Sequence, residues 1–144
     1  MKKKYKVLML AEHFMTGGVE RLLQEITAAK SAEFDFEFLA IGKKGGFARK
    51  YEKAGFKVGS AGVKRGIVPF IFSLRRLVKT IKNISPDIIH SHLWLGNFAA
   101  RYTGKKLGIP VIATEHNIHS GYRFYHRLID GIYAGAPGYL VAVS

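Results

Sequence analysis

The sequence has no cysteine among its 144 residues. Disulfide bonds and metal sites built from thiolates are therefore excluded, and a cytoplasmic location is allowed. Long apolar runs are missing too, since none approaches the roughly 20 residues of a membrane-spanning helix. The basic start, MKKKYK, precedes a short apolar segment that soon reaches Glu12 and lacks a cleavage site of small residues. This segment indicates a first strand and not a signal peptide.

Acidic residues are scarce: ten Asp and Glu stand against 23 Lys and Arg, which gives a net charge of +13. Such an excess favours polyanionic partners, namely nucleic acid, an anionic membrane surface or phosphorylated ligands. Nucleic acid has the least support of the three, because no zinc finger, RNP-type sheet or arginine-rich recognition helix is present. In other respects the composition is that of a globular protein, and the length suffices for one domain with a sizeable core.

Strands and helices alternate along the chain. Near-continuous apolar runs predict buried strands, and apolar residues at three- and four-residue steps predict helices. The predicted strands are Val7–Ala11, Phe34–Ile41, Phe56–Val58, Asp87–Ser91, Pro110–Thr114 and Tyr139–Val143. The predicted helices are Val19–Ala32, Phe47–Ala54, Pro69–Ile84, Leu95–Leu107 and Tyr122–Tyr133. The alternation predicts an α/β fold, a doubly wound, Rossmann-like parallel sheet with helices on both faces.

The turn after the first strand contains the glycine pair Gly17-Gly18. Glycine lets a ligand approach the backbone closely, and the N-terminus of the following helix favours a phosphate or another anion. Two glycines before a helix can equally serve only to turn the chain, because the sequence is neither G-x-G-x-x-G nor a Walker loop. Both interpretations of this turn stay open.

Polar residues gather at the carboxyl edge of the predicted sheet, which is the edge where ligands bind in open α/β folds. Five of the six histidines follow predicted strands at or near this edge, and His126 is the exception. The residues in question are Glu12, His13, Gly17, Gly18, His90, Ser91, His92, Glu115, His116, Asn117 and His119. Because histidine moves protons near neutral pH and binds sugar hydroxyls and phosphates, this concentration predicts a site.

Other chemistries compete for these residues. His90, His92 and His116 could ligate zinc, although no carboxylate has an obvious ligand spacing, so we predict no metal. Each histidine could also be a hydrogen-bonded structural residue at a strand end. A nucleophilic triad lacks support, because there is no cysteine and no G-x-S-x-G elbow.

The predicted helix Pro69–Ile84 has a cationic face opposite its apolar stripe. That face carries Phe72, Arg75, Arg76, Lys79 and Lys82, and Lys64 and Arg65 precede the helix. A cationic helix face with an exposed aromatic residue is suited to lie on anionic lipid. The alternative is a solvated helix that only covers the sheet.

The motifs taken together resemble a known family. GGVERLLQEI after the first strand, SPDIIHSHLWLGNFAARYTGKKLGIPVIATEHN in the middle and YLVAVS at the end are similar to the N-terminal domain of family-4 retaining glycosyltransferases of GT-B architecture. The resemblance implies an enzyme of two Rossmann-like domains facing a cleft, with no metal or other cofactor. It implies that the N-terminal domain holds the acceptor and that the C-terminal domain holds most of the nucleotide-sugar donor.

The resemblance also implies roles for single residues. Gly17 and Gly18 match the loop at the donor diphosphate, and His116 matches the catalytic histidine near the transferred sugar. His92 matches a histidine on the acceptor side, where we also expect His90 and Asn117. The basic helix resembles the membrane-docking helix of members that glycosylate lipid carriers.

The paired-glutamate motif of the family belongs to a C-terminal domain that this chain does not contain. We therefore expect residues 1–144 to be the N-terminal domain of a longer protein, inactive without its second half. Its expected function is transfer of a sugar to a glycan or lipid-linked acceptor in cell-surface polysaccharide synthesis, at the cytoplasmic membrane face. The alternative is an α/β module that binds a nucleotide or phosphorylated ligand without catalysis.

Overall fold

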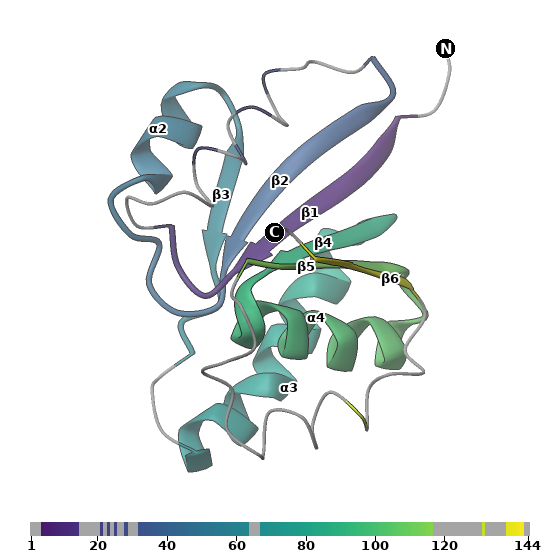
Figure 1. Cartoon of the computed structure of the whole chain (residues 1–144). Helices are drawn as coiled ribbons and strands as arrows, with labels where there is room; N and C mark the ends of the chain where they lie inside the picture. Colours follow the sequence, from purple (N-terminus) through teal and green to yellow (C-terminus); the bar gives the residue numbers. More distant parts are fainter. Residues whose placement is uncertain are drawn as a thin grey trace.

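The computed structural model describes residues 4–14, 21, 23, 25, 28, 32–63, 67–116, 131 and 138–142. Its strands form one sheet in the order β3-β2-β1-β4-β5-β6, and every neighbouring pair is parallel (Figure 1). The strands are β1 Tyr5–Ala11, β2 Phe34–Ala40, β3 Lys57–Ser60, β4 Ile88–His92, β5 Val111–Glu115 and β6 Gly138–Ala142. The described helices are α2 Ala48–Lys53, α3 Ile67–Ile84 and α4 Leu93–Leu107. This arrangement confirms the predicted α/β fold.

The order of the strands reverses next to β1. The chain runs outward from β1 to β3 and then returns through α3 to place β4 on the other side of β1. In register, Leu10 of β1 lies beside Ser91 of β4. A reversal of this kind opens a crevice between the carboxyl ends of the two strands, which is where α/β folds bind ligands.

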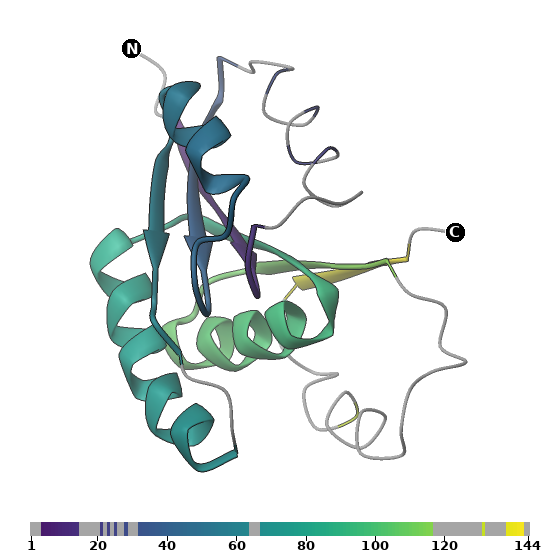
Figure 2. The same ribbon diagram turned by 90° about the vertical axis from the view of Figure 1, so that its left-hand side faces the viewer.

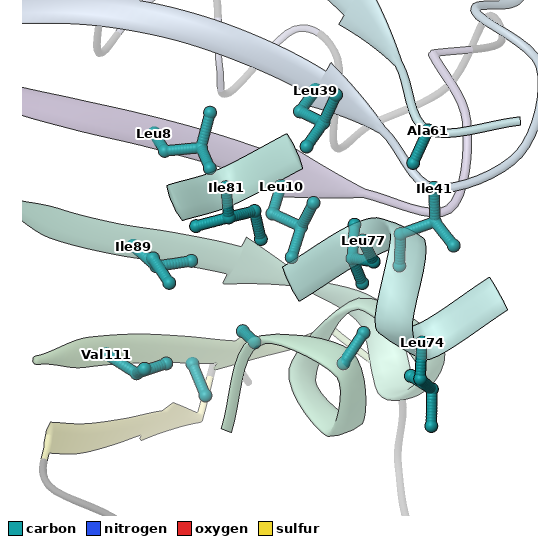
Figure 3. Packing of buried hydrophobic residues seen from close by; sticks show 13 residues of the cluster. Leu8, Leu10, Leu39, Ile41, Ala61, Leu74, Leu77, Ile81, Ile89 and Val111 are labelled. Atoms are coloured by element: carbon teal, nitrogen blue, oxygen red, sulfur yellow. The ribbon is translucent and has the colours of Figure 1, made fainter. Parts of the chain in front are cut away.

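Side chains of β1 alternate between two hydrophobic clusters. Leu8 and Leu10 pack against α3 and α4, together with the neighbouring strands (Figure 3). Met9 and Ala11 pack in the second cluster, to which α2 contributes Tyr51. Figure 2 shows α2 on one side of the sheet and α3 and α4 on the other. Helices thus cover both faces, as the prediction of a doubly wound sheet requires.

The apolar stripe of α3 lies as its spacing predicts. Leu74, Leu77 and Ile81 are buried against the sheet (Figure 3). The helix begins at Ile67, two residues before the predicted start, so that Pro69 falls in its first turn. Proline is tolerated there because a first-turn N–H has no partner within the helix.

The junction between β4 and α4 is tighter than the sequence predicts. The helix begins at Leu93 and not at Leu95, directly after the last residue of β4. Leu93 has a φ of +65°, a left-handed conformation that reverses the chain in one step and is costly for a leucine. Gly108, with a φ of +69°, ends the helix as predicted.

Two glycines allow α4 to lie close to the sheet. A Cβ at Gly96 would stand 3.3 Å from the carbonyl oxygen of Leu10, at the carboxyl end of β1. A Cβ at Gly104 would stand 2.5 Å from a methyl carbon of Val111, in β5. The absence of a side chain at Gly96 lets the first turn of α4 approach the carboxyl end of β1, and its absence at Gly104 lets the last turn approach the amino end of β5.

The remaining predicted strands are confirmed with shifted boundaries. The short edge strand predicted at Phe56–Val58 corresponds to β3, and the strand predicted at Tyr139–Val143 corresponds to β6. Strand ends fall where the hydrogen-bonded ladder stops, and a sequence pattern locates that point only to within a residue or two. No helix in the described part of the chain is long and apolar enough to cross a membrane.

Several predictions fall on residues that the structure leaves out. Within the predicted helix Val19–Ala32, residues 21, 23, 25 and 28 are described and helical, and Leu23 is buried against the second cluster. Outside the described residues lie Gly17, Gly18, Lys64, Arg65, Asn117, His119, His126 and most of the predicted helix Tyr122–Tyr133.

Candidate functional site

Three histidines predicted at the carboxyl edge form one cluster, in which His92 contacts both His90 and His116. Alternation along β4 places His90 and His92 on the same face, with ring centroids 4.4 Å apart. His116 directly follows β5, the next strand, and its Nε2 lies 3.0 Å from Nδ1 of His92. On the same face, Nε2 of His90 lies 3.0 Å from the hydroxyl oxygen of Thr114. The neighbouring strand ends thus carry a continuous row of hydrogen-bonding side chains.

Burial keeps two of these histidines neutral. His92 has 0% of its surface exposed. Burial, followed by the positive charges of His90 and His116, lowers the pKa of His92 from 6.5 to about 3. Burial and then the charge of His116 lower the pKa of His90 from 6.5 to about 4. At neutral pH each of these rings therefore offers one N–H donor and one acceptor nitrogen, and no positive charge.

A second layer of polar side chains lies on the opposite face of β4 and β5. Ser91 points toward α4, and its hydroxyl donates a hydrogen bond of 2.8 Å to Oδ1 of Asn97. Nδ2 of Asn97 donates to the carbonyl oxygen of Thr114, at 3.1 Å, and to Oε2 of Glu115, at 3.3 Å. All four residues are buried. These bonds join the start of α4 to the ends of both strands.

Glu115 connects the two layers. Its Oε1 accepts a hydrogen bond of 3.1 Å from the backbone N–H of His116, while its Oε2 accepts the bond from Asn97. Glu115 is 8% exposed, and these hydrogen bonds compensate for the burial of its carboxylate. Sequence reasoning placed Glu115 at this edge but gave no role to Asn97 or Thr114. A signal for Asn97 was present, since it lies three residues before Ala100 on the apolar side of α4.

The other predicted edge residues are only partly brought together. Glu12 and His13 follow β1 and are half-buried. Nδ1 of His13 is buried without a hydrogen-bond partner in the part of the chain that the structure describes. The glycine pair, Asn117 and His119 lie outside the described residues. Of the five histidines predicted at this edge, three are seen in one cluster, and His13 is described at the end of β1.

The zinc alternative needs several ligands that converge on one point. Within residues 4–14, 32–63, 67–116 and the shorter described pieces, no group of three or more His, Asp or Glu is arranged to hold a metal ion. His92 and His116 direct ring nitrogens toward each other, and His90 directs Nε2 toward Thr114. This geometry is that of a hydrogen-bonded cluster.

The cationic face of α3 is exposed as predicted. Phe72 has 71% of its surface exposed, and Arg75, Arg76, Lys79 and Lys82 are exposed with it. The guanidinium of Arg76 lies beside Gly62, just beyond the carboxyl end of β3, with the nearest nitrogen 3.7 Å from where a Cβ of that glycine would stand. The first half of the basic face therefore lies on the same side of the domain as the carboxyl edge of the sheet.

Solved structures of other proteins share this fold. A UDP-N-acetylglucosamine 2-epimerase superposes with a TM-score of 0.69 and 20% identity, over 97% of this chain and 42% of that one. MurG of Acinetobacter baumannii superposes with a TM-score of 0.70 and 17% identity, over 97% of this chain and 41% of MurG. The UDP-GlcNAc 2-epimerase of Methanocaldococcus jannaschii superposes with a TM-score of 0.66 and 15% identity, over 96% of this chain and 39% of the epimerase. The chain thus spans about two fifths of the length of these proteins.

Comparison with families of known sequences identifies the chain more closely. A search of curated proteins finds no match. The model of Glycosyltransferase Family 4 matches residues 16–144, which include the histidines of β4, the Asn97 network and His116. This match covers most of the chain and confirms the resemblance drawn from the sequence motifs. The chain belongs to glycosyltransferase family 4.

Proposed function

We propose that the chain is the acceptor-side domain of a retaining, two-domain glycosyltransferase that moves a sugar from a nucleotide-sugar donor to a glycan or lipid-linked acceptor. The bond of 3.0 Å between His92 and His116 is the observation that carries this proposal. It joins two strand ends beside the reversal of strand order, where a ligand crevice is expected. The family match supports sugar transfer as the chemistry performed there.

In this proposal, His116 is the catalytic histidine and contacts the transferred sugar. It is half-buried and one residue beyond β5, and its ring is held by His92. An imidazole ring can form a hydrogen bond with a sugar hydroxyl. His90, His92 and Asn117 form the acceptor side, and Gly17 and Gly18 approach the donor diphosphate. The main catalytic effect is electrostatic stabilisation of the departing nucleotide diphosphate by the complete enzyme.

The donor is proposed to be a nucleotide sugar, which acts as co-substrate without another cofactor. Two structures of the same fold are epimerases of UDP-N-acetylglucosamine, and another, Staphylococcus aureus MnaA, was solved with UDP. A further domain that binds this donor is part of the proposal. The chain's length, about two fifths of its structural neighbours, supports that arrangement.

The acceptor is proposed to lie at an anionic membrane surface on the cytoplasmic side, as part of cell-surface polysaccharide synthesis. The exposed cationic face of α3, with Phe72 at 71% exposure, supports peripheral docking. Each basic residue close to an anionic surface contributes about 1 kcal/mol to such binding. The position of Arg76 beside Gly62 would orient the carboxyl edge of the sheet toward the lipid.

The test is sugar transfer by the complete enzyme carrying His116→Ala. We expect kcat to fall by about two to three orders of magnitude, because a hydrogen bond to the reacting sugar is lost, while circular dichroism stays unchanged. Glu52→Ala is the control, since it removes an exposed side chain bonded to Lys44 on another part of the surface. Unchanged transfer by the His116→Ala enzyme would contradict the proposed role.

Calorimetry on the 144-residue chain separates catalysis from binding alone. The proposal predicts weak nucleotide-sugar binding, because most donor contacts come from the second domain. Tight binding of a nucleotide by this chain, combined with no transfer by the complete enzyme, would indicate a non-catalytic module.

A further inference from the structure

We propose that Glu115 and Asn97 are positioning residues that set the location of His116. This inference rests on the proposed function of His116, and it concerns the buried face of the sheet, behind the histidines. Asn97 and Glu115 belong to the second polar layer, on the face of β4 and β5 opposite His90 and His92. They act through the backbone of His116, by the chain of hydrogen bonds from Ser91 to Asn97 to Glu115.

The orientation of the Asn97 amide is fixed by its neighbours. The backbone carbonyl of Thr114 can only accept, so the atom of Asn97 that faces it at 3.1 Å must be the NH2 nitrogen. Oδ1 therefore faces the hydroxyl of Ser91 and accepts a hydrogen bond of 2.8 Å from it. With this orientation set, the second N–H of Asn97 is directed at Oε2 of Glu115.

Glu115 is surrounded by donors on both of its oxygens. Nδ2 of Asn97 approaches Oε2, and the backbone N–H of His116 approaches Oε1. Only a carboxylate presents two acceptor oxygens in this position. A glutamine would present one acceptor oxygen and one NH2 group, and the NH2 group would meet a donor whichever way it turned.

His116 is consequently held from both faces of the sheet. Its ring is bonded to His92 on one face, and its backbone N–H is bonded to Glu115 on the other. β5 ends at Glu115, so His116 is the first residue after the strand. Losing the Glu115 bond would allow His116 to shift, and a displacement of about 1 Å at a reacting group can lower the rate about 100-fold.

The test uses Glu115→Gln, Asn97→Asp and the two substitutions combined. Each single variant places like groups in contact: two donors in Glu115→Gln, and two acceptors in Asn97→Asp. In the double variant, the introduced glutamine can donate to the introduced aspartate and still accept from the N–H of His116. The hydrogen bond from residue 97 to the carbonyl oxygen of Thr114 remains lost in the double variant. We therefore expect the double variant to restore the position of His116 more fully than the free energy of unfolding. Thr103→Val is the control, because that hydroxyl is buried in the same helix without a hydrogen-bond partner among the described residues.

Two measurements decide the outcome. In the 144-residue chain, hydrogen exchange of the His116 amide should accelerate at least about tenfold in Glu115→Gln and return toward wild type in the double variant. In the complete enzyme, kcat per folded molecule should fall about 10- to 100-fold in each single variant and recover in the double, with KM for donor and acceptor nearly unchanged. Thr103→Val should alter neither quantity.

The two measurements test the positioning role of Glu115 separately from the proposed sugar transfer. Unchanged amide exchange in Glu115→Gln would overturn the inference, whatever the enzyme does. Faster exchange with an unchanged kcat would also overturn it, because a purely structural role would then suffice. If the wild-type enzyme transfers no sugar, the proposed function fails, and the exchange measurement still decides whether Glu115 holds His116.

Discussion

Acidification should destabilise the fold through His90 and His92. Burial, with smaller contributions from neighbouring histidines, lowers their pKa values from 6.5 to about 4 and about 3. At neutral pH both residues are uncharged in the folded and in the unfolded chain. As the pH falls below 6.5, the unfolded chain takes up protons that the folded chain does not, so the free energy of unfolding decreases.

The size of the effect follows from the number of protons involved. Each histidine lowers the free energy of unfolding by up to about 1.4 kcal/mol per pH unit within its window. The window runs from pH 6.5 to about 4 for His90 and to about 3 for His92. Where the windows overlap, the two residues together remove up to about 3 kcal/mol per unit. That is a large share of the roughly 5 to 15 kcal/mol that stabilises a typical domain.

Urea unfolding at several pH values across this window measures the effect. His92→Gln keeps a neutral, hydrogen-bonding side chain that does not titrate, so the stability of this variant should depend less steeply on pH. The difference in slope should approach about 1.4 kcal/mol per pH unit, and Thr103→Val should keep the wild-type slope. Equal slopes for wild type and His92→Gln would refute the claim that His92 stays buried and neutral in the folded protein.

Two further predictions concern packing and membrane docking. Gly104→Ala should lower the free energy of unfolding by about 1–2 kcal/mol, because the added methyl would stand 2.5 Å from a side-chain methyl of β5. This overpacking outweighs the gain in helix propensity. Thermal unfolding measures the change, and an equal or higher Tm would contradict the prediction. Arg75→Glu combined with Arg76→Glu should weaken sedimentation with anionic liposomes at least tenfold, at about 1 kcal/mol per charge removed. The same reversals at Arg49 and Lys53, exposed on α2, are the control, and equal loss in both pairs would indicate a net-charge effect without a docking face.

Local patterns in the sequence were enough to predict the architecture. Apolar runs, and apolar residues at three- and four-residue spacing, indicate which face of each strand or helix is buried. This pattern involves only residues close together in the sequence, so it can be recognised without the tertiary structure. The stripe of Leu74, Leu77 and Ile81 is buried as its spacing indicated. The predicted start of α4 was wrong by two residues. The helix begins at Leu93, whose left-handed conformation joins it to β4 without any turn residue that would mark the boundary in the sequence.

The sequence by itself also determined the family and the histidine-rich edge. It could not determine which histidines meet, since His92 and His116 are 24 residues apart and their bond depends on the register of β4 against β5. Nor could it show that Asn97, on a helix, closes a network with Glu115 from behind the sheet. Hydrogen bonds of this kind require distances of about 3 Å and specific angles. Such geometry exists only after strands and helix have packed, so the tertiary structure alone decided it.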